Sequence, residues 1–148
     1  MEQLIVGKSL EMQLATLLDT LPSDATVSYM VTRLNEGEEA TIVASSKETI
    51  VHTGASMVKT LILEYVFHLA AQEQLDLNDT IALSRSPRVE GAGALMELVG
   101  NHSFSYLELC RLMMVLSDNW ATNLLMQALG MENINARAEQ LGLEHFEI

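Results

Sequence analysis

Leucines recur at helical spacing near the start of the chain. Over residues 4–19, Leu10, Leu14 and Leu17 follow one another at intervals of four and three, which predicts an amphipathic helix. Pro22-Ser23-Asp24 is a breaker sequence, so we expect this helix to end before it.

Alternating, β-branched residues follow the first helix. Residues 26–34 and 41–45 predict two strands, and the turn residues Asn35-Glu36-Gly37-Glu38 between them predict a hairpin. A short extended segment over residues 49–52 leads into the rest of the chain. Two strands are marginal alone, and we expect no further strand after residue 52.

Helical periodicity dominates the remaining sequence. Ser105 and Glu108 have the spacing of a capping box, and Gly130 and Gly142 are typical helix ends. Helices are expected over residues 56–74, 105–116, 119–129 and 133–141, with a mixed segment at 79–103 that contains Gly91-Ala92-Gly93. The order predicts an α+β fold in which residues 1–52 supply a helix and hairpin and residues 53–148 an all-helical part, together one domain.

Composition and charge narrow the functional classes. The 148 residues suffice for one domain with a real core, and 49% of them are hydrophobic. The net charge of −12 opposes phosphate backbones and anionic membrane surfaces, so we expect no nucleic-acid partner. No stretch has the length and apolarity of a membrane span. Met1–Lys8 lacks the pattern of a signal peptide, and the sequence does not indicate in which cellular compartment the protein acts.

Cysteine and histidine give no indication of a metal or redox site. The single cysteine, Cys110, excludes an internal disulfide and lies in an apolar run that predicts burial. The histidines lack metal-ligand spacing: His52, His68, His102 and His145. No lysine followed by Ser or Thr comes after Gly91-Ala92-Gly93, as a phosphate loop requires. We therefore expect neither a metal nor a cofactor.

Two short motifs carry candidate chemistry. Ser56 begins a predicted helix, where backbone N–H groups and the helix dipole favour developing negative charge. Lys59, three residues later, lies on the same face among apolar neighbours and is a candidate proton acceptor. Ser117 and Asn119 lie at the junction of two predicted helices, where a hydroxyl can relay a proton and an amide can contact Lys59 or a substrate amide. Asp118 between them suits the structural task of capping the second helix.

Each motif also has an ordinary structural interpretation. Taken alone, each of Ser56-Met57-Val58-Lys59 and Ser117-Asp118-Asn119 is better explained as a helix cap than as a catalytic motif. Because both motifs fall at predicted helix junctions of one chain, we favour the catalytic interpretation.

The same residues resemble a known family. Ser56-Met57-Val58-Lys59 with Ser117-Asp118-Asn119 are similar to two of the three motifs of class A β-lactamases and penicillin-binding proteins. The similarity extends over residues 112–125, 76–79 and 89–93. The resemblance implies that Ser56 is the acylated nucleophile and that Lys59 is a candidate base. It further implies that Ser117 relays a proton to the lactam nitrogen and that Asn119 contacts the amide side chain of the substrate.

Other parts of the family pattern have no match in the 148 residues. The third motif, Lys-Thr-Gly or Lys-Ser-Gly, is absent, since none of the three lysines precedes such a pair. The deacylating glutamate of the family also lacks a counterpart, because Glu144 and Glu147 do not match its pattern. The chain therefore resembles the N-terminal part of a family member, and such proteins are usually secreted or periplasmic.

Three functional alternatives remain open. The first is a serine hydrolase that opens a β-lactam or a peptidoglycan-like substrate through Ser56. The second is a truncated or degenerate relative that self-associates, or pairs with a C-terminal fragment, and binds without turnover. The third is a generic helical binding module. The motifs do not separate a β-lactamase from a transpeptidase or carboxypeptidase.

Overall fold

A computed structural model describes residues 9–34, 36–37, 39–143, 145–146 and 148. The chain forms two compact units, which divide between His52 and Thr53. Both Glu144 and Glu147, and the first residues of the predicted N-terminal helix, lie outside the described residues. No helix in the described part is long and apolar enough to span a membrane.

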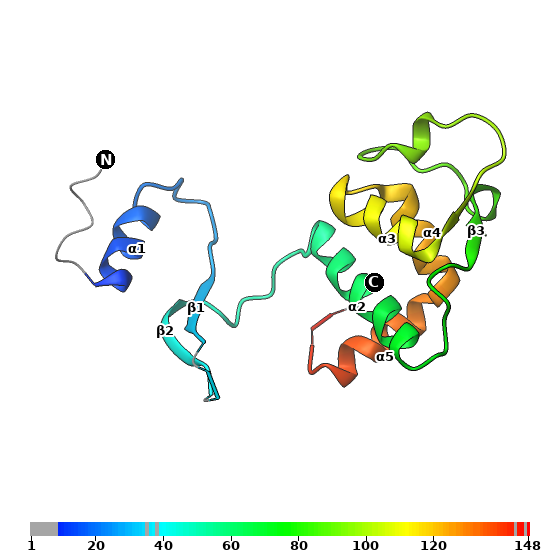
Figure 1. Ribbon diagram of the computed structural model, residues 1–148. Coiled ribbons are helices and arrows are strands. Elements are labelled where there is room, and N and C mark those ends of the chain that lie inside the picture. Colours follow the sequence, from blue (N-terminus) through cyan, green and yellow to red (C-terminus); the bar gives the residue numbers. More distant parts are fainter. Residues whose placement is uncertain (1–8, 35, 38, 144, 147) are drawn as a thin grey trace. The chain divides into compact units, whose positions relative to one another are not determined.

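The first unit consists of one helix and one hairpin (Figure 1). Helix α1 (Leu10–Leu18) is capped by Ser9, whose side chain accepts a hydrogen bond from the Met12 N–H at 3.3 Å. Strands β1 (Tyr29–Arg33) and β2 (Thr41–Ser46) pair antiparallel, as the alternation predicts, with a register irregularity after Val31. Ala44 is the only buried apolar residue among the described residues of this unit.

The second unit is mainly helical. Its elements are η2 (Ala55–Met57), α2 (Val58–Ala71), β3 (Thr80–Ala82), η3 (Leu83–Arg85), η4 (Leu95–Glu97), β4 (Ser103–Ser105), α3 (Tyr106–Val115), α4 (Asn119–Leu129) and α5 (Met131–Gln140). The capping box of α3 is present, with the Glu108 N–H donating to Ser105 Oγ and the Ser105 N–H to Glu108 Oε2. Helix α4 has the predicted bounds.

The prediction of no strand after residue 52 is wrong. Strands β3 and β4 form a second, two-stranded antiparallel sheet in which Ile81 lies opposite Phe104. A bond from the Leu83 N–H to the His102 carbonyl, at 2.9 Å, extends the pairing. Three-residue strands are too short for an alternation to be recognised, and their partners are set by tertiary contacts.

The starts of α2 and α5 also differ from those predicted. Ser56 lies in the 3-10 turn η2, and the α-helical geometry of α2 begins only at Val58. Helix α5 begins at Met131 instead of Asn133, because Gly130 serves both helices at once. Its N–H donates to the Met126 carbonyl of α4, and its own carbonyl accepts from the Ile134 N–H of α5.

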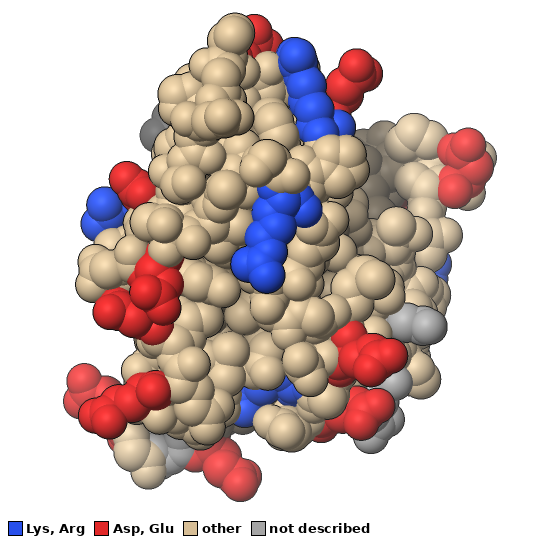
Figure 2. All heavy atoms as spheres, turned by 90° about the vertical axis from the view of Figure 1, so that its right-hand side faces the viewer, with Lys and Arg blue, Asp and Glu red and all other residues tan. Residues whose placement is uncertain are grey.

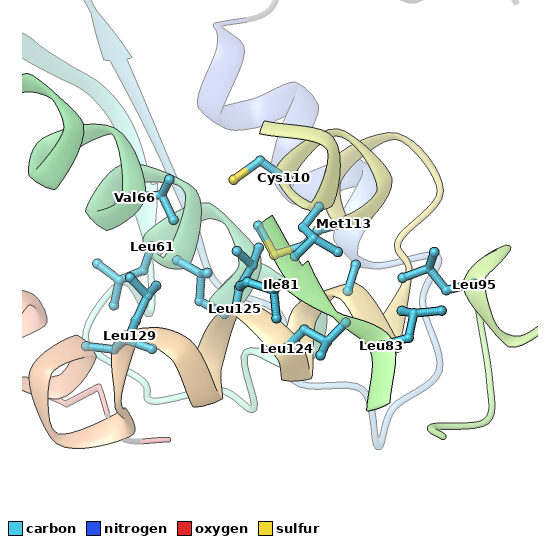
Figure 3. Packing of buried hydrophobic residues seen from close by; sticks show 14 of the residues in the cluster. Leu61, Val66, Ile81, Leu83, Leu95, Cys110, Met113, Leu124, Leu125 and Leu129 are labelled. Carbon is cyan, nitrogen blue, oxygen red and sulfur yellow. The ribbon is translucent and has the colours of Figure 1, made fainter. Parts of the chain in front are cut away.

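The hydrophobic core lies wholly in the second unit and is built from all its main elements (Figure 3). Buried side chains converge from α2, α3, α4 and α5, with additions from β3 and η4: Ile62, Val66, Ile81, Leu95, Leu109, Met113, Leu124, Leu125 and Ile134. Cys110 is buried here as predicted, and burial raises the pKa of its thiol to about 11. This core fixes α2 against the junction of α3 and α4, which places the two motifs together.

Most charged side chains lie on the surface, and Lys59 and Asp118 are the buried exceptions among the described residues. In the view of Figure 2, acidic side chains are spread over the visible face and are not gathered in one patch. Within the described residues, no group of three or more His, Cys, Asp or Glu side chains could hold a metal ion.

Candidate active site

The two motifs meet where the start of α2 faces the turn between α3 and α4. Ser56 is exposed, whereas Lys59, one turn further along, is only 5% exposed. Ser117 occupies the turn with a φ of 53°, a left-handed conformation that a serine rarely adopts. Local strain of this kind is often found at functional sites.

Lys59 Nζ binds three oxygens of the second motif. It donates to the Ser117 carbonyl at 2.7 Å, to Ser117 Oγ at 2.8 Å and to Asn119 Oδ1 at 3.1 Å. The left-handed turn at Ser117 allows both its carbonyl and its hydroxyl to approach the amine. The predicted contact between Lys59 and Asn119 is therefore present.

Ser56 is connected to the amine through Ser117. Its Oγ lies 3.3 Å from Ser117 Oγ, and either hydroxyl can be the donor. Among the described residues, Ser56 is not a hydrogen-bond partner of Lys59 Nζ. The shared helix face thus directs both side chains to Ser117, and the three groups form a continuous chain of hydrogen bonds.

This arrangement satisfies Lys59 in either protonation state. An ammonium has three N–H donors for the three oxygens. A neutral amine has two, which serve the Ser117 carbonyl and Asn119 Oδ1, so that its lone pair can accept from Ser117 Oγ. The same three oxygens therefore match the hydrogen-bonding groups of both forms of the amine.

Asp118 stabilises the turn between α3 and α4, and its side chain is buried, with only 1% of the residue exposed. Its Oδ1 accepts from the Ala121 N–H of α4 at 2.9 Å, which is the predicted cap. Its Oδ2 also accepts from the N–H groups of Ala94 and Leu95, at 2.7 and 2.9 Å. The capping role was foreseeable from the sequence, but the bonds to the start of η4 were not, because nothing local specifies them.

The glycine-rich segment wraps around Asn119. The Asn119 N–H donates to the Ala92 carbonyl at 2.9 Å, and Asn119 Nδ2 lies 3.5 Å from the Glu90 carbonyl. The Glu90 carbonyl can only accept, so Nδ2 faces it, and the same orientation leaves Oδ1 to accept from Lys59. No local pattern in the sequence connects Gly91 and Gly93 with Asn119, because the contacts are set by the tertiary structure.

Trp120 contributes packing next to the motif. It is half-buried against the hydrophobic core, and its indole N–H is buried without a partner among the described residues.

Comparison with known proteins places this geometry in a family. The model of the beta-lactamase enzyme family matches residues 9–148. Beta-lactamase BRO-1 of Moraxella catarrhalis is 31% identical over 97 residues, which are 61% of this chain and 31% of that protein.

Two solved structures of PBP-A are similar over nearly the whole chain. One covers 93% of this chain and 51% of its own, with 25% identity and a TM-score of 0.74. The other, an L158E mutant described as an acyl-enzyme complex with penicillin G, covers 95% and 53%, with 26% identity and a TM-score of 0.75. A beta-lactamase from Sphaerobacter thermophilus covers 80% and 44%, with 25% identity and a TM-score of 0.69.

The chain thus spans about half the length of these solved structures and a third of the curated relative. The α+β fold agrees with the resemblance in the sequence. Since the family model matches residues 9–148, the chain belongs to the beta-lactamase enzyme family.

Proposed function

We propose that the chain carries the nucleophile half of a serine hydrolase site that opens a β-lactam amide through an acyl-enzyme on Ser56. The hydrogen-bonded chain from Ser56 Oγ through Ser117 Oγ to Lys59 Nζ is the observation that carries this proposal. The step between Ser117 Oγ and Lys59 Nζ, at 2.8 Å, lies within reach of proton transfer, and the step from Ser56 Oγ, at 3.3 Å, is slightly long, as is common in sites without substrate.

The proposed reaction follows this chain. Ser56 Oγ forms a bond to the lactam carbonyl carbon while its proton passes to Ser117 Oγ and the Ser117 proton passes to neutral Lys59 Nζ. The carbon–nitrogen bond then breaks, and the proton returns from Lys59 through Ser117 to the leaving nitrogen. The net result is an ester on Ser56 and a secondary amine in the opened ring, and Lys59 ends neutral, as it began.

The position of each group supports its role. Ser56 lies at the N-terminal end of α2, where the helix dipole favours an anionic oxygen. Asn119, held by Lys59 on one side, can offer an Nδ2 hydrogen to an amide of the substrate. Asp118 stabilises the turn on which Ser117 and Asn119 lie.

Intact-protein mass spectrometry after incubation with penicillin G tests the proposal. We expect the wild type to gain the mass of one penicillin and Ser56→Ala to gain none. No adduct on the wild type, or an equal adduct on Ser56→Ala, would contradict it. Because no deacylating glutamate or third motif matches in these residues, we expect the adduct to persist, with little turnover of nitrocefin.

The alternative is a partial relative that binds or assembles without turnover. It is favoured by one observation, that the chain spans about half the length of the structures it matches. If such a relative self-associates or pairs with a C-terminal fragment, we expect assemblies in solution. A stable, monodisperse monomer by light scattering, unchanged by co-expression with a C-terminal half of a relative, would contradict it.

A further inference from the structure

We propose that Gly91 is a positioning residue for Asn119, an inference that rests on the proposed function. The residues directly before and after Gly91 each place a backbone carbonyl against Asn119. The Glu90 carbonyl faces Asn119 Nδ2, and the Ala92 carbonyl accepts from the Asn119 N–H. Gly91 lies between these two contacts.

A side chain at position 91 has no room. A Cβ atom there would lie 2.5 Å from Asn119 Nδ2 and 3.7 Å from its Cγ. Heavy atoms of this kind repel one another strongly at such a separation, so either the amide or the segment must move. Gly91 also has a φ of +115°, a conformation that favours glycine.

Movement of the amide would disturb the lysine. Asn119 Oδ1 is one of the three acceptors of Lys59 Nζ, and the same amide donates to Glu90 from its other end. A rotation that relieves the clash at Nδ2 also withdraws Oδ1, because the two atoms share one plane. Gly91 therefore acts on Lys59 through Asn119, although it contacts neither Ser56 nor Ser117.

A matched glycine allows the steric effect to be separated from backbone strain. Gly100 has a φ of +98°, and an added Cβ there meets no atom within 4 Å. Gly91→Ala and Gly100→Ala thus place an alanine in similarly unfavourable conformations. Only the first creates a collision with Asn119.

The first measurement is the rate of acylation by penicillin G, followed by intact mass. We expect Gly91→Ala to slow acylation about tenfold to a hundredfold, as misplacement of a catalytic group does, and Gly100→Ala to change it by no more than about twofold. Equal effects of the two variants would overturn the inference.

The second measurement does not depend on acylation. We expect the side-chain amide ¹H–¹⁵N signals of Asn119 to shift in Gly91→Ala and to stay in place in Gly100→Ala. An unchanged Asn119 signal in Gly91→Ala would overturn the inference. If the wild type forms no penicillin adduct, the proposed function fails, while these signals still decide the role of Gly91.

A third variant serves in case Gly91→Ala does not fold. In an Asn119→Ala background the colliding amide is removed, so Gly91→Ala should lower the thermal midpoint no more than Gly100→Ala does in that background. A larger loss for Gly91→Ala there would show that position 91 acts independently of Asn119 and would overturn the inference.

Discussion

Lys59 is the residue on which the candidate chemistry depends most. Its amine joins the two motifs, because it binds two oxygens of Ser117 and one of Asn119 while its stem is buried beside the core. The sequence predicts the lysine and its face of the helix. That the amine reaches Ser56 through Ser117 depends on the packing of α2 against the α3–α4 junction, which no local pattern encodes.

Replacement of Lys59 by alanine should slow acylation by penicillin about 10²- to 10⁴-fold, the usual loss for a general base. Quenched-flow mass spectrometry measures the rate. Lys47→Ala, a lysine of the other unit, is the control and should acylate normally. A generic binding module instead predicts that Lys59→Ala leaves every activity unchanged.

Asp118 should matter for stability more than any other polar residue of the site. Asp118→Ala leaves the N–H groups of Ala94, Leu95 and Ala121 without their acceptor, and we expect a loss of about 3–5 kcal/mol in the free energy of unfolding. Urea denaturation measures it. Asp76→Ala, which removes an exposed bond to the Asn78 N–H, is the control and should cost below about 1 kcal/mol. Similar losses in both variants would contradict this role.

At the scale of elements, the ion pair between Glu64 of α2 and Arg137 of α5 links two core helices. The hydrogen bond from Arg137 lowers the pKa of the Glu64 carboxyl. A lowered pKa in the folded state adds stability above the unfolded pKa of about 4.3, and this contribution is lost as the pH falls through the folded value.

Glu64→Gln should therefore lower the thermal midpoint at pH 7 and have progressively less effect as the pH falls below about 4. Thermal melts monitored by circular dichroism from pH 3 to pH 7 give the two curves. Glu139→Gln, an exposed residue of α5, is the control and should follow the wild type throughout. A Glu64→Gln deficit that does not shrink at acidic pH would contradict the assignment.

Elements were predictable from sequence where their signals are local. The capping box at Ser105 and the bounds of α4 follow from residues within one turn of each helix end. Strands β3 and β4 escaped prediction because each is three residues long and their partner lies far along the chain. The contacts of Asp118 and Asn119 with residues 90–95 were not predictable for the same reason, because they join segments that are distant in sequence.

At the scale of the whole molecule, the two units differ in how much core they contain. The second unit holds the entire cluster of buried apolar residues, whereas the first contributes only Ala44 to the buried apolar set of the described residues. The sheet of the first unit has two strands, and isolated hairpins are marginal in water. Stability thus resides in residues 53–148.

Separate expression of the units tests this distribution. We expect residues 53–148 to give a helical circular dichroism spectrum and a cooperative thermal transition, and residues 1–52 to remain unfolded alone. The full chain, melted under the same conditions, is the reference. Loss of cooperative unfolding in the 53–148 fragment would show that the first unit is required for the core.

The central claim is that Ser56 is the nucleophile, and peptide mapping of the penicillin adduct tests it most directly. Trypsin cuts after Lys47, Lys59, Arg111 and Arg137, so Ser56 and Ser117 fall in separate peptides, 48–59 and 112–137. We predict that the added mass lies on peptide 48–59 and that fragmentation assigns it to Ser56, not to Thr49 or Thr53. An adduct on peptide 112–137, or on no peptide, would contradict the claim.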